Sequence, residues 1–302
     1  MQGERPPSED ISWMTSKVEK TDGKLRGENQ ESNDTIQQPY MKEYIKVLLK
    51  CEKTYLESPK NFRTNIKSRN IVVDWLIHVH DRYKLAQTVL HKTVSLMDDY
   101  SSKRHVGNNS LQLVGIACMS LTVKNAGTHI DSGTLVELCG SYFSKEDLHD
   151  MEIDVIQMAQ FDLNRPVCPQ FLLVVNEYFD FPTRIMTVSK YFLDLWLFHH
   201  DFVRYRTSVL ASSAILFAFH AMDESREISK WTSHLAGLFR FTKPEMEKTL
   251  SALYKTVNQF DFAIHPSIQD KYSAEIFKKA SRKFRGSREL DSFSDLKIPE
   301  TV

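Results

Sequence analysis

Two stretches of the sequence, far apart in the chain, share one layout. Lys92 to Ser110 and Lys190 to Ser208 are equal in length. In each, an apolar helical pattern leads through a short charged turn and a serine into small and aliphatic residues, SLQLVGIACMSL in one and SVLASSAILFAF in the other. Small side chains let helices approach closely, which suits the central helix of a bundle. The sequence therefore predicts a tandem repeat of two helical bundles.

The spacing of apolar residues elsewhere supports the same fold class. From Pro39 onward they recur every three or four positions, Gly and Pro are rare, and the alternation typical of strands is almost absent. Asn164, Arg165 and Pro166 interrupt this pattern. We therefore expect an all-α fold of two tandem five-helix bundles preceded by an N-terminal helix. The expected helices are 41–56, then 68–84, 87–101, 110–125, 132–141 and 145–161, then 168–179, 183–200, 207–223, 228–238 and 243–260.

Composition sets the expected domain boundaries. Residues 1–38 are polar and have few large apolar side chains, so they are predicted to form a disordered arm. Residues 39–165 would hold the N-terminal helix and first bundle, 166–265 the second bundle, and 266–302 a C-terminal tail that is polar and loose from about Ser281. The N-terminal MQGERPPSED lacks the apolar stretch of a signal peptide. The longest apolar run, Val209 to Phe219, is shorter than the roughly 20 residues of a membrane helix, so no membrane partner is expected.

The charge balance narrows the classes of partner. Lys plus Arg total 39 and Asp plus Glu total 39, so the chain has no net field with which to hold nucleic acid or an acidic membrane. The four cysteines are widely spaced, without a C-x-x-C pair or a histidine at zinc-finger spacing. We expect ordinary intracellular thiols, no metal and no cofactor.

The segment SRNIVVDWLIHVHDRYKL, residues 68–85, is apolar on almost every side of its helix and yet contains Arg69 and Asp74. An unpaired buried charge costs several kcal/mol. Arg69 therefore needs an acidic partner, and Asp98, near the end of the next helix, is the candidate. Asp74 could cap a helix or form a salt bridge within the bundle, and no active role is assigned to it.

Several motifs in order resemble the cyclin family, and within it the B-type mitotic cyclins. SRNIVVDWLIHV is similar to the first helix of the cyclin box, TVSLMDD to the second and SLQLVGIACMSLTVK to the third. HDMEIDVIQMAQFDLNRPVCPQFL resembles the fifth helix with the bridge to the second repeat, and YFLDLWLFHHDFVRYRTSVLASSAILFAF resembles part of that repeat. The resemblance covers about residues 39–275.

The resemblance implies that the chain performs no chemistry of its own and is the regulatory subunit of a cyclin-dependent kinase, in a heterodimer that controls the G2/M transition. By position, Arg69 and Asp98 are the structural ion pair of the family, whereas Lys124 and Glu152 are the residues that bind the kinase. Nucleus and cytoplasm are the expected locations.

The resemblance also implies a role for the N-terminal helix, YMKEYIKVLLKCEK, which in the family packs on the kinase. Tyr44 and Leu48 are its expected anchors.

A surface patch that many cyclins use to recruit substrates or inhibitors with Arg-x-Leu type motifs also maps onto this sequence. Ser68 stands where methionine is usual in the family, and His78 where an acid is common. The corresponding residues are Ile71, Val72, Trp75, Leu111, Gln112 and Leu113.

The sequence departs from the family pattern after Lys124. Asn125, Ala126 and Gly127 replace an aromatic residue and two glutamates, which removes an apolar contact and two acidic groups from the expected interface. Regulated degradation is not assumed from the sequence, since RGEN at 26–29 only approaches a Lys-Glu-Asn box and the single Arg-x-x-Leu found, RYKL, lies within the predicted first bundle.

Three alternatives remain open from the sequence. A degenerate cyclin would keep the fold and bind without activating a kinase. A transcription module of the TFIIB type would share the tandem fold, although the neutral charge and the lack of cysteine pairs oppose it. A metal-dependent phosphohydrolase could use His199, His200 and Asp201, but no second ligand cluster accompanies them.

Overall fold

In a computed structural model of the chain, the described residues are 31–57, 65–199 and 204–284. Contacts divide the chain into two compact units, Met1–Lys42 and Glu43–Val302. The described part of the first unit is the beginning of helix α2 (Glu31–Glu57). The second unit contains the rest of α2 and both bundles.

The first bundle consists of five helices, α3 (Ile66–Arg82), α4 (Gln87–Lys103), α5 (Leu111–Asn125), α6 (Ser132–Leu138) and α7 (Lys145–Met158). Helix α5 is central and packs against α3, α4 and α7. Its composition allows this close approach. A Cβ added at Gly115 would lie 2.9 Å from Cγ1 of Val72, so only glycine lets α3 and α5 meet at this spacing.

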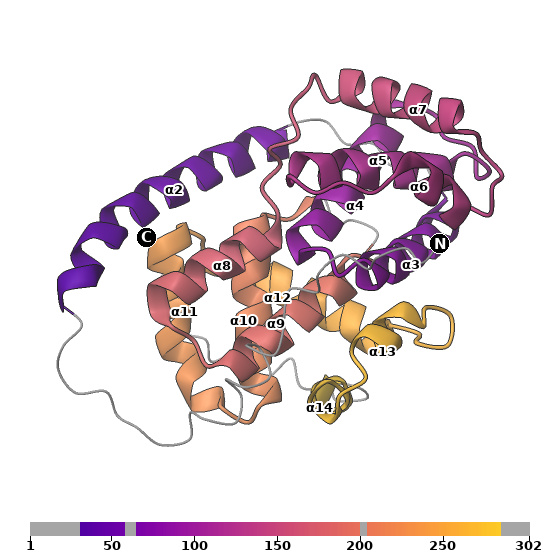
Figure 1. The fold of residues 1–302 in the computed structure, drawn as a ribbon. Coiled ribbons are helices and arrows are strands. Elements are labelled where there is room, and N and C mark those ends of the chain that lie inside the picture. Colours follow the sequence, from indigo (N-terminus) through magenta and orange to yellow (C-terminus); the bar gives the residue numbers. More distant parts are fainter. Residues whose placement is uncertain (1–30, 58–64, 200–203, 285–302) are drawn as a thin grey trace, which may run out of the picture. The chain divides into compact units, whose positions relative to one another are not determined.

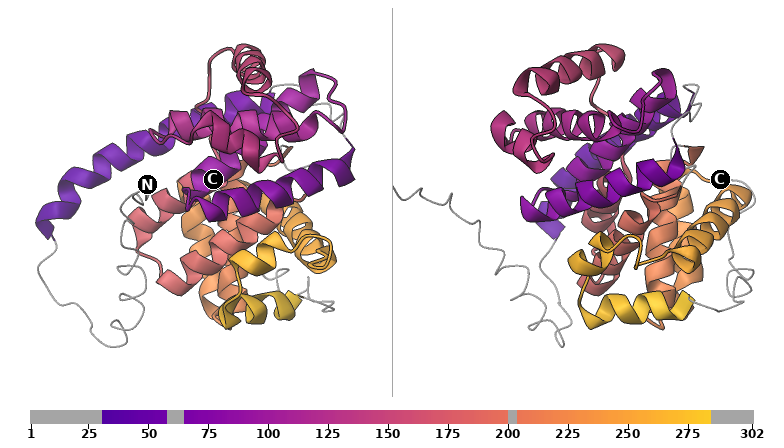
Figure 2. Two further views of the ribbon diagram at one scale, coloured as in Figure 1. Left: turned by 45° about the vertical axis from the view of Figure 1, so that its right-hand side comes forward. Right: turned by 90° about the vertical axis from the view of Figure 1, so that its right-hand side faces the viewer.

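The second bundle repeats the plan with α8 (Cys168–Phe179), α9 (Thr183–Trp196), α10 (Thr207–Ala221), α11 (Ile228–Phe239) and α12 (Lys243–Gln259). A short 3₁₀ turn, Ser225–Glu227, precedes α11. Helix α10 packs against all four other helices of this bundle, and nearly every one of its residues is buried. Figures 1 and 2 show the first bundle, in purple and magenta, beside the second, in orange. The tandem all-α prediction is confirmed, and no strand occurs among the described residues.

Local sequence signals explain where several of these helices begin. The Asn65 side chain accepts hydrogen bonds from the first backbone N–H groups of α3. Ser144 and Thr242 each form a capping box with the acidic residue three positions later, at the starts of α7 and α12. These caps satisfy N–H groups that have no partner within the helix.

The structure contains helices in two segments where the sequence predicted none. Helix α2 begins at Glu31, inside the segment predicted to be disordered, and residues 1–30 of that predicted arm lie outside the described residues. The predicted tail from residue 266 contains two further helices, α13 (Ser267–Lys271) and α14 (Glu275–Phe284), drawn in yellow in Figures 1 and 2. Helix α13 packs on α3 and α14 packs on α9, α10 and α12, so tertiary contacts order a segment whose own helical signal is short.

Within the described part of the chain, no helix is both long and apolar enough to pass through a lipid bilayer.

Candidate partner-binding surface

The Lys124 and Glu152 side chains meet at the surface of the first bundle. Lys124 lies in the last turn of α5, and its Nζ donates to both carboxylate oxygens of Glu152 on α7, at 2.8 and 2.7 Å. The Lys124 side chain is 40% exposed and that of Glu152 10%. The Lys124 end of the pair is therefore open to water, whereas Glu152 is buried. The ammonium can reach a partner from the surface, and the Glu152 carboxylate would need another donor if Lys124 turned away.

The segment that departs from the family pattern ends helix α5. Asn125 is its last residue, Ala126 caps it, and Gly127 has a φ of +76°, a conformation that favours glycine at a helix C-terminus. All three residues are exposed. Exposed apolar side chains in this part of the chain are Tyr142, in the connection between α6 and α7, at 85%, and Ile153, next to Glu152 in α7, at 40%.

The two residues expected to anchor a partner on α2 differ in exposure. Tyr44 is half-buried, whereas Leu48 is only 6% exposed. Leu48 faces inward in this structure, and its role as an anchor for the kinase stays a prediction. Val47, three residues after Tyr44 on the same helix, is an exposed apolar residue, at 56%.

A hollow of about 390 Å³ lies over α3 and the segment leading into α5. Four of the six residues predicted for the docking patch line it, whereas Leu111 and Leu113, at 1% and 9% exposure, pack in the core and are not part of its lining. When a helix is apolar on all sides, the spacing of its apolar residues does not show which side faces the core and which faces water. No lining residue is charged. The lining residues are Ser68, Ile71, Val72, Trp75, Asn108 and Gln112.

The Arg69 guanidinium lies against Asp98, the partner that the sequence suggested. Nε and Nη2 donate to the two carboxylate oxygens at 2.8 and 2.7 Å, and both residues are 2% exposed. The third contact was not anticipated. Nη1 donates to the backbone carbonyl of Leu197 at 2.8 Å, so the same arginine also joins the first bundle to the second.

Asp74 acts at the junction with the C-terminal helices. Its carboxylate accepts from the Ser267 hydroxyl at 2.6 Å and from the Ser267 backbone N–H at 3.2 Å, at the start of α13. His78, one turn further along α3, lies 3.9 Å from the same carboxylate.

Asp194 on α9 is the polar centre that sequence reasoning missed. Its buried carboxylate accepts from Gln87 at 2.7 Å, from Lys271 at 2.7 Å and from Tyr272 at 2.6 Å, and lies 2.9 Å from Nε2 of His91. These groups come from the first bundle and from the segment after the second. An acidic residue inside the apolar run YFLDLW was the available signal, of the same kind as Arg69.

Burial, charges and hydrogen bonds together set the pKa values of Asp194 and of the histidines near it. Burial alone would raise the pKa of Asp194, but the Lys271 charge and the hydrogen bonds from His91 and Lys271 hold that pKa well below its usual range. Burial, reinforced by the Lys271 charge, lowers the pKa of His80 to about 4. His80 is therefore neutral at pH 7, and burial lowers the pKa of His91 as well.

The residues considered for a metal site do not form one in the described part of the chain. His199 stacks on Trp196 and its Nδ1 lies 2.9 Å from the Thr256 hydroxyl, while His200 and Asp201 lie outside the described residues. Among the described residues, no group of three or more His, Cys, Asp or Glu side chains could hold a metal ion.

Two family models match the chain. The model "Cyclin, N-terminal domain" matches residues 43–164, and "Cyclin, C-terminal domain" matches residues 168–284. The second match includes α13 and α14.

Curated relatives include G2/mitotic-specific cyclins B of three animals. The protein of Hydra vulgaris is 29% identical over 82% of this chain and 69% of the relative. That of Hydra viridissima is 28% identical, over 83% and 64%, and that of Patella vulgata 27%, over 71% and 52%. The chain thus spans between about half and just over two thirds of the length of these relatives.

Among solved structures, the viral cyclin from herpesvirus saimiri superposes with a TM-score of 0.59 at 16% identity, over 75% of this chain and 98% of the viral one. A chain of the yeast RNA polymerase II CTD kinase CTDK-1 complex gives 0.57 at 11% identity, over 85% and 93%. These similarities establish the fold.

Proposed function

The chain belongs to the cyclin family, and we propose that it is the regulatory subunit of a mitotic cyclin-dependent kinase acting at the G2/M transition. Cyclins regulate kinases and are not themselves enzymes, and this chain is related to the B-type cyclins. The observation that carries the proposal is the contact between Lys124, partly exposed in the last turn of α5, and Glu152 in the middle of α7.

The proposed mechanism uses this pair as a charged clamp. In complex with the kinase, the Lys124 ammonium and the Glu152 carboxylate would turn from each other to backbone carbonyl and N–H groups at the mobile C-helix of the kinase. Each charged group would then form charge-assisted hydrogen bonds to neutral backbone groups, which are about twice as strong as hydrogen bonds between two neutral groups. Binding only the active position of that helix shifts the kinase population toward it.

Tyr44 on α2 would add a second contact with the kinase. It is half-buried, so part of the ring is available to a partner, and Val47, at 56% exposure, lies three residues further along the helix. Aromatic side chains on such a face commonly dominate binding energy.

We propose that the hollow over α3 docks substrates or inhibitors that carry Arg-x-Leu type motifs. Ile71, Val72 and Trp75 offer apolar surface for the leucine, and Gln112 and Asn108 can hydrogen-bond to the peptide backbone. The lining offers no carboxylate to the arginine. Apolar contact would therefore supply most of the affinity. Nucleus and cytoplasm are the proposed locations.

A second candidate function is a scaffold that binds a kinase without activating it. The exposed segment Asn125–Gly127 favours it, because this segment presents neither an aromatic side chain nor an acid where the family usually has both.

The test is phosphorylation of a histone-type substrate by a purified mitotic cyclin-dependent kinase, with and without this protein, alongside a binding titration. Activation that disappears in the folded Lys124→Ala/Glu152→Ala variant supports the proposal. The matched control is Lys230→Ala/Glu227→Ala, which removes an exposed Lys–Glu pair of the second bundle. Binding without activation supports the scaffold, and normal affinity in the Lys124/Glu152 double variant contradicts the assigned clamp.

A further inference from the structure

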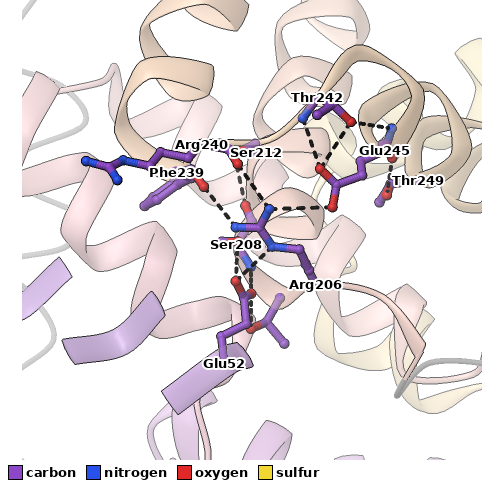
Figure 3. A network of polar contacts seen from close by, with 10 residues as sticks. Glu52, Arg206, Ser208, Ser212, Phe239, Arg240, Thr242, Glu245 and Thr249 are labelled. Carbon is purple, nitrogen blue, oxygen red and sulfur yellow. Dashed lines mark hydrogen bonds and ion pairs between the residues drawn. The ribbon is translucent and has the colours of Figure 1, made fainter. Parts of the chain in front are cut away.

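Glu52 on α2 is a buried carboxylate that caps a helix of the second bundle. It is 2% exposed. One oxygen accepts from the Ser208 backbone N–H at 2.7 Å and the Thr207 hydroxyl at 2.9 Å, and the other from the Ser208 hydroxyl at 2.8 Å and Arg206 Nε at 3.1 Å (Figure 3). The N-cap residue of α10, Arg206, provides no side-chain cap of its own. A carboxylate from another helix therefore satisfies a backbone N–H in the first turn of α10, that of Ser208, and complements the helix dipole.

Arg206 extends this contact across the second bundle. Besides Glu52, it donates to the backbone carbonyls of Phe239 at 2.8 Å and Arg240 at 3.2 Å, at the end of α11, and approaches Glu245 on α12 at 3.5 Å (Figure 3). A cation at a helix C-terminus is favourable. Glu52 is thus coupled to three helices of the second bundle through three consecutive residues, Arg206, Thr207 and Ser208.

Three residues after Glu52, α2 contacts the first bundle. The Tyr55 hydroxyl lies 2.8 Å from the Ser95 hydroxyl on α4, and the Arg165 guanidinium lies 5.0 Å from the centre of the Tyr55 ring. Arg165 belongs to the connection between the bundles and pairs with the buried Asp99. Residues three apart share one helix face. One face of α2 therefore holds the second bundle through Glu52 and the first bundle through Tyr55.

The same helix carries the contacts proposed for the kinase. Tyr44 lies two turns before Glu52, about 12 Å along the axis of a rigid helix. We infer that Glu52 is a positioning residue, which fixes the register of α2 on both bundles and thereby places Tyr44 and Val47 relative to Lys124 and Glu152. The part of this inference that concerns the kinase rests on the proposed function. The part that concerns α2, which Glu52 fixes on both bundles, rests only on the contacts described above.

Hydrogen exchange of the free protein tests the fixing of α2. Glu52→Gln keeps the shape, but it removes the charge and turns an NH₂ group toward donors on α10. We expect amides of residues 43–56 to exchange at least tenfold faster than in the unmodified protein, while those of α5 change less than twofold. The control Glu177→Gln changes an exposed carboxylate on α8 and should leave both regions unchanged. Unchanged exchange of α2 in folded Glu52→Gln would overturn the inference.

A milder variant covers the case in which Glu52→Gln does not fold. Thr207→Val with Ser208→Ala removes two hydroxyl donors and keeps the carboxylate, and it should accelerate exchange of α2 by a smaller factor. Faster exchange confined to α10, with none in α2, would show that the contact serves α10 alone.

Kinase affinity tests whether the position of α2 that Glu52 fixes matters for binding the partner. Glu52→Gln should weaken binding at least tenfold although it changes no residue of the proposed interface, and unchanged affinity would overturn the positioning role. If the unmodified protein binds no kinase, the proposed function and the positioning role both fail. The exchange experiment would still decide whether Glu52 fixes α2.

Discussion

Replacing Arg69 by methionine should destabilise the protein strongly. The variant keeps an apolar side chain of similar length but removes all three of the donors that Arg69 supplies to Asp98 and to the Leu197 carbonyl. Asp98 is 2% exposed and would remain as a buried carboxylate without its cation. Breaking a buried ion pair by removing one partner costs about 3–5 kcal/mol.

The expected change in melting temperature follows from the size of the bundles. For domains of about 150–250 residues, 1 kcal/mol shifts Tm by about 2–4 °C. Scanning calorimetry of Arg69→Met should therefore show a fall of roughly 6–20 °C. The control Lys84→Met breaks an exposed pair with Asp81, and we expect it to shift Tm by less than about 4 °C.

A double variant distinguishes the cost of an unpaired charge from that of lost packing. Arg69→Met with Asp98→Leu leaves no buried charge, and replacing a whole buried pair by apolar residues is often neutral. Its Tm should recover most of the loss. A single variant that melts within about 2 °C of the unmodified protein would refute the reasoning, as would a double variant that melts as low as the single one.

Three further perturbations test other parts of the structure. Because folding lowers the pKa of His80 from 6.5 to about 4, this histidine binds a proton more readily in the unfolded chain than in the folded protein. The free energy of unfolding that neutral His80 contributes is fully present above about pH 6.5 and declines by at most about 3 kcal/mol toward pH 4. Denaturant titrations of folded His80→Gln should show a smaller loss between pH 7 and 4.5, and an equal loss would exclude this role. Truncation after residue 265 removes the Lys271 and Tyr272 donors from buried Asp194 and should lower Tm by about 10 °C or more, whereas truncation after residue 284 keeps them; equal Tm values would contradict the assignment. In calorimetric titrations, an Arg-x-Leu peptide and its Ala-x-Leu counterpart should bind within about threefold of each other, and Trp75→Ala should weaken both about tenfold or more; a large preference for arginine would show that a carboxylate takes part.

The local spacing of apolar and small residues was sufficient to predict the helices and the tandem repeat. Helical period depends on neighbours three and four residues apart, and the small residues of SLQLVGIACMSL marked α5 as central because no larger side chain fits between packed helices. The same logic paired Arg69 with Asp98, since a charge in an apolar helix must find its opposite. Lys124 and Glu152 were brought together by resemblance, and the structure places them in contact.

The sequence by itself determined the helical repeat and which polar residues are anomalous. The tertiary structure alone decided which of them meet. Asp194 gathers donors from residues 87 to 272, and Glu52 caps a helix more than 150 residues away. The tertiary structure also decided which side of each apolar helix faces water. It leaves Ile71 and Trp75 of α3 at the surface and Leu111 and Leu113 of α5 in the core. The physical reason is that period and propensity act over one helical turn, whereas burial and the pairing of charges depend on segments that only the folded chain brings together.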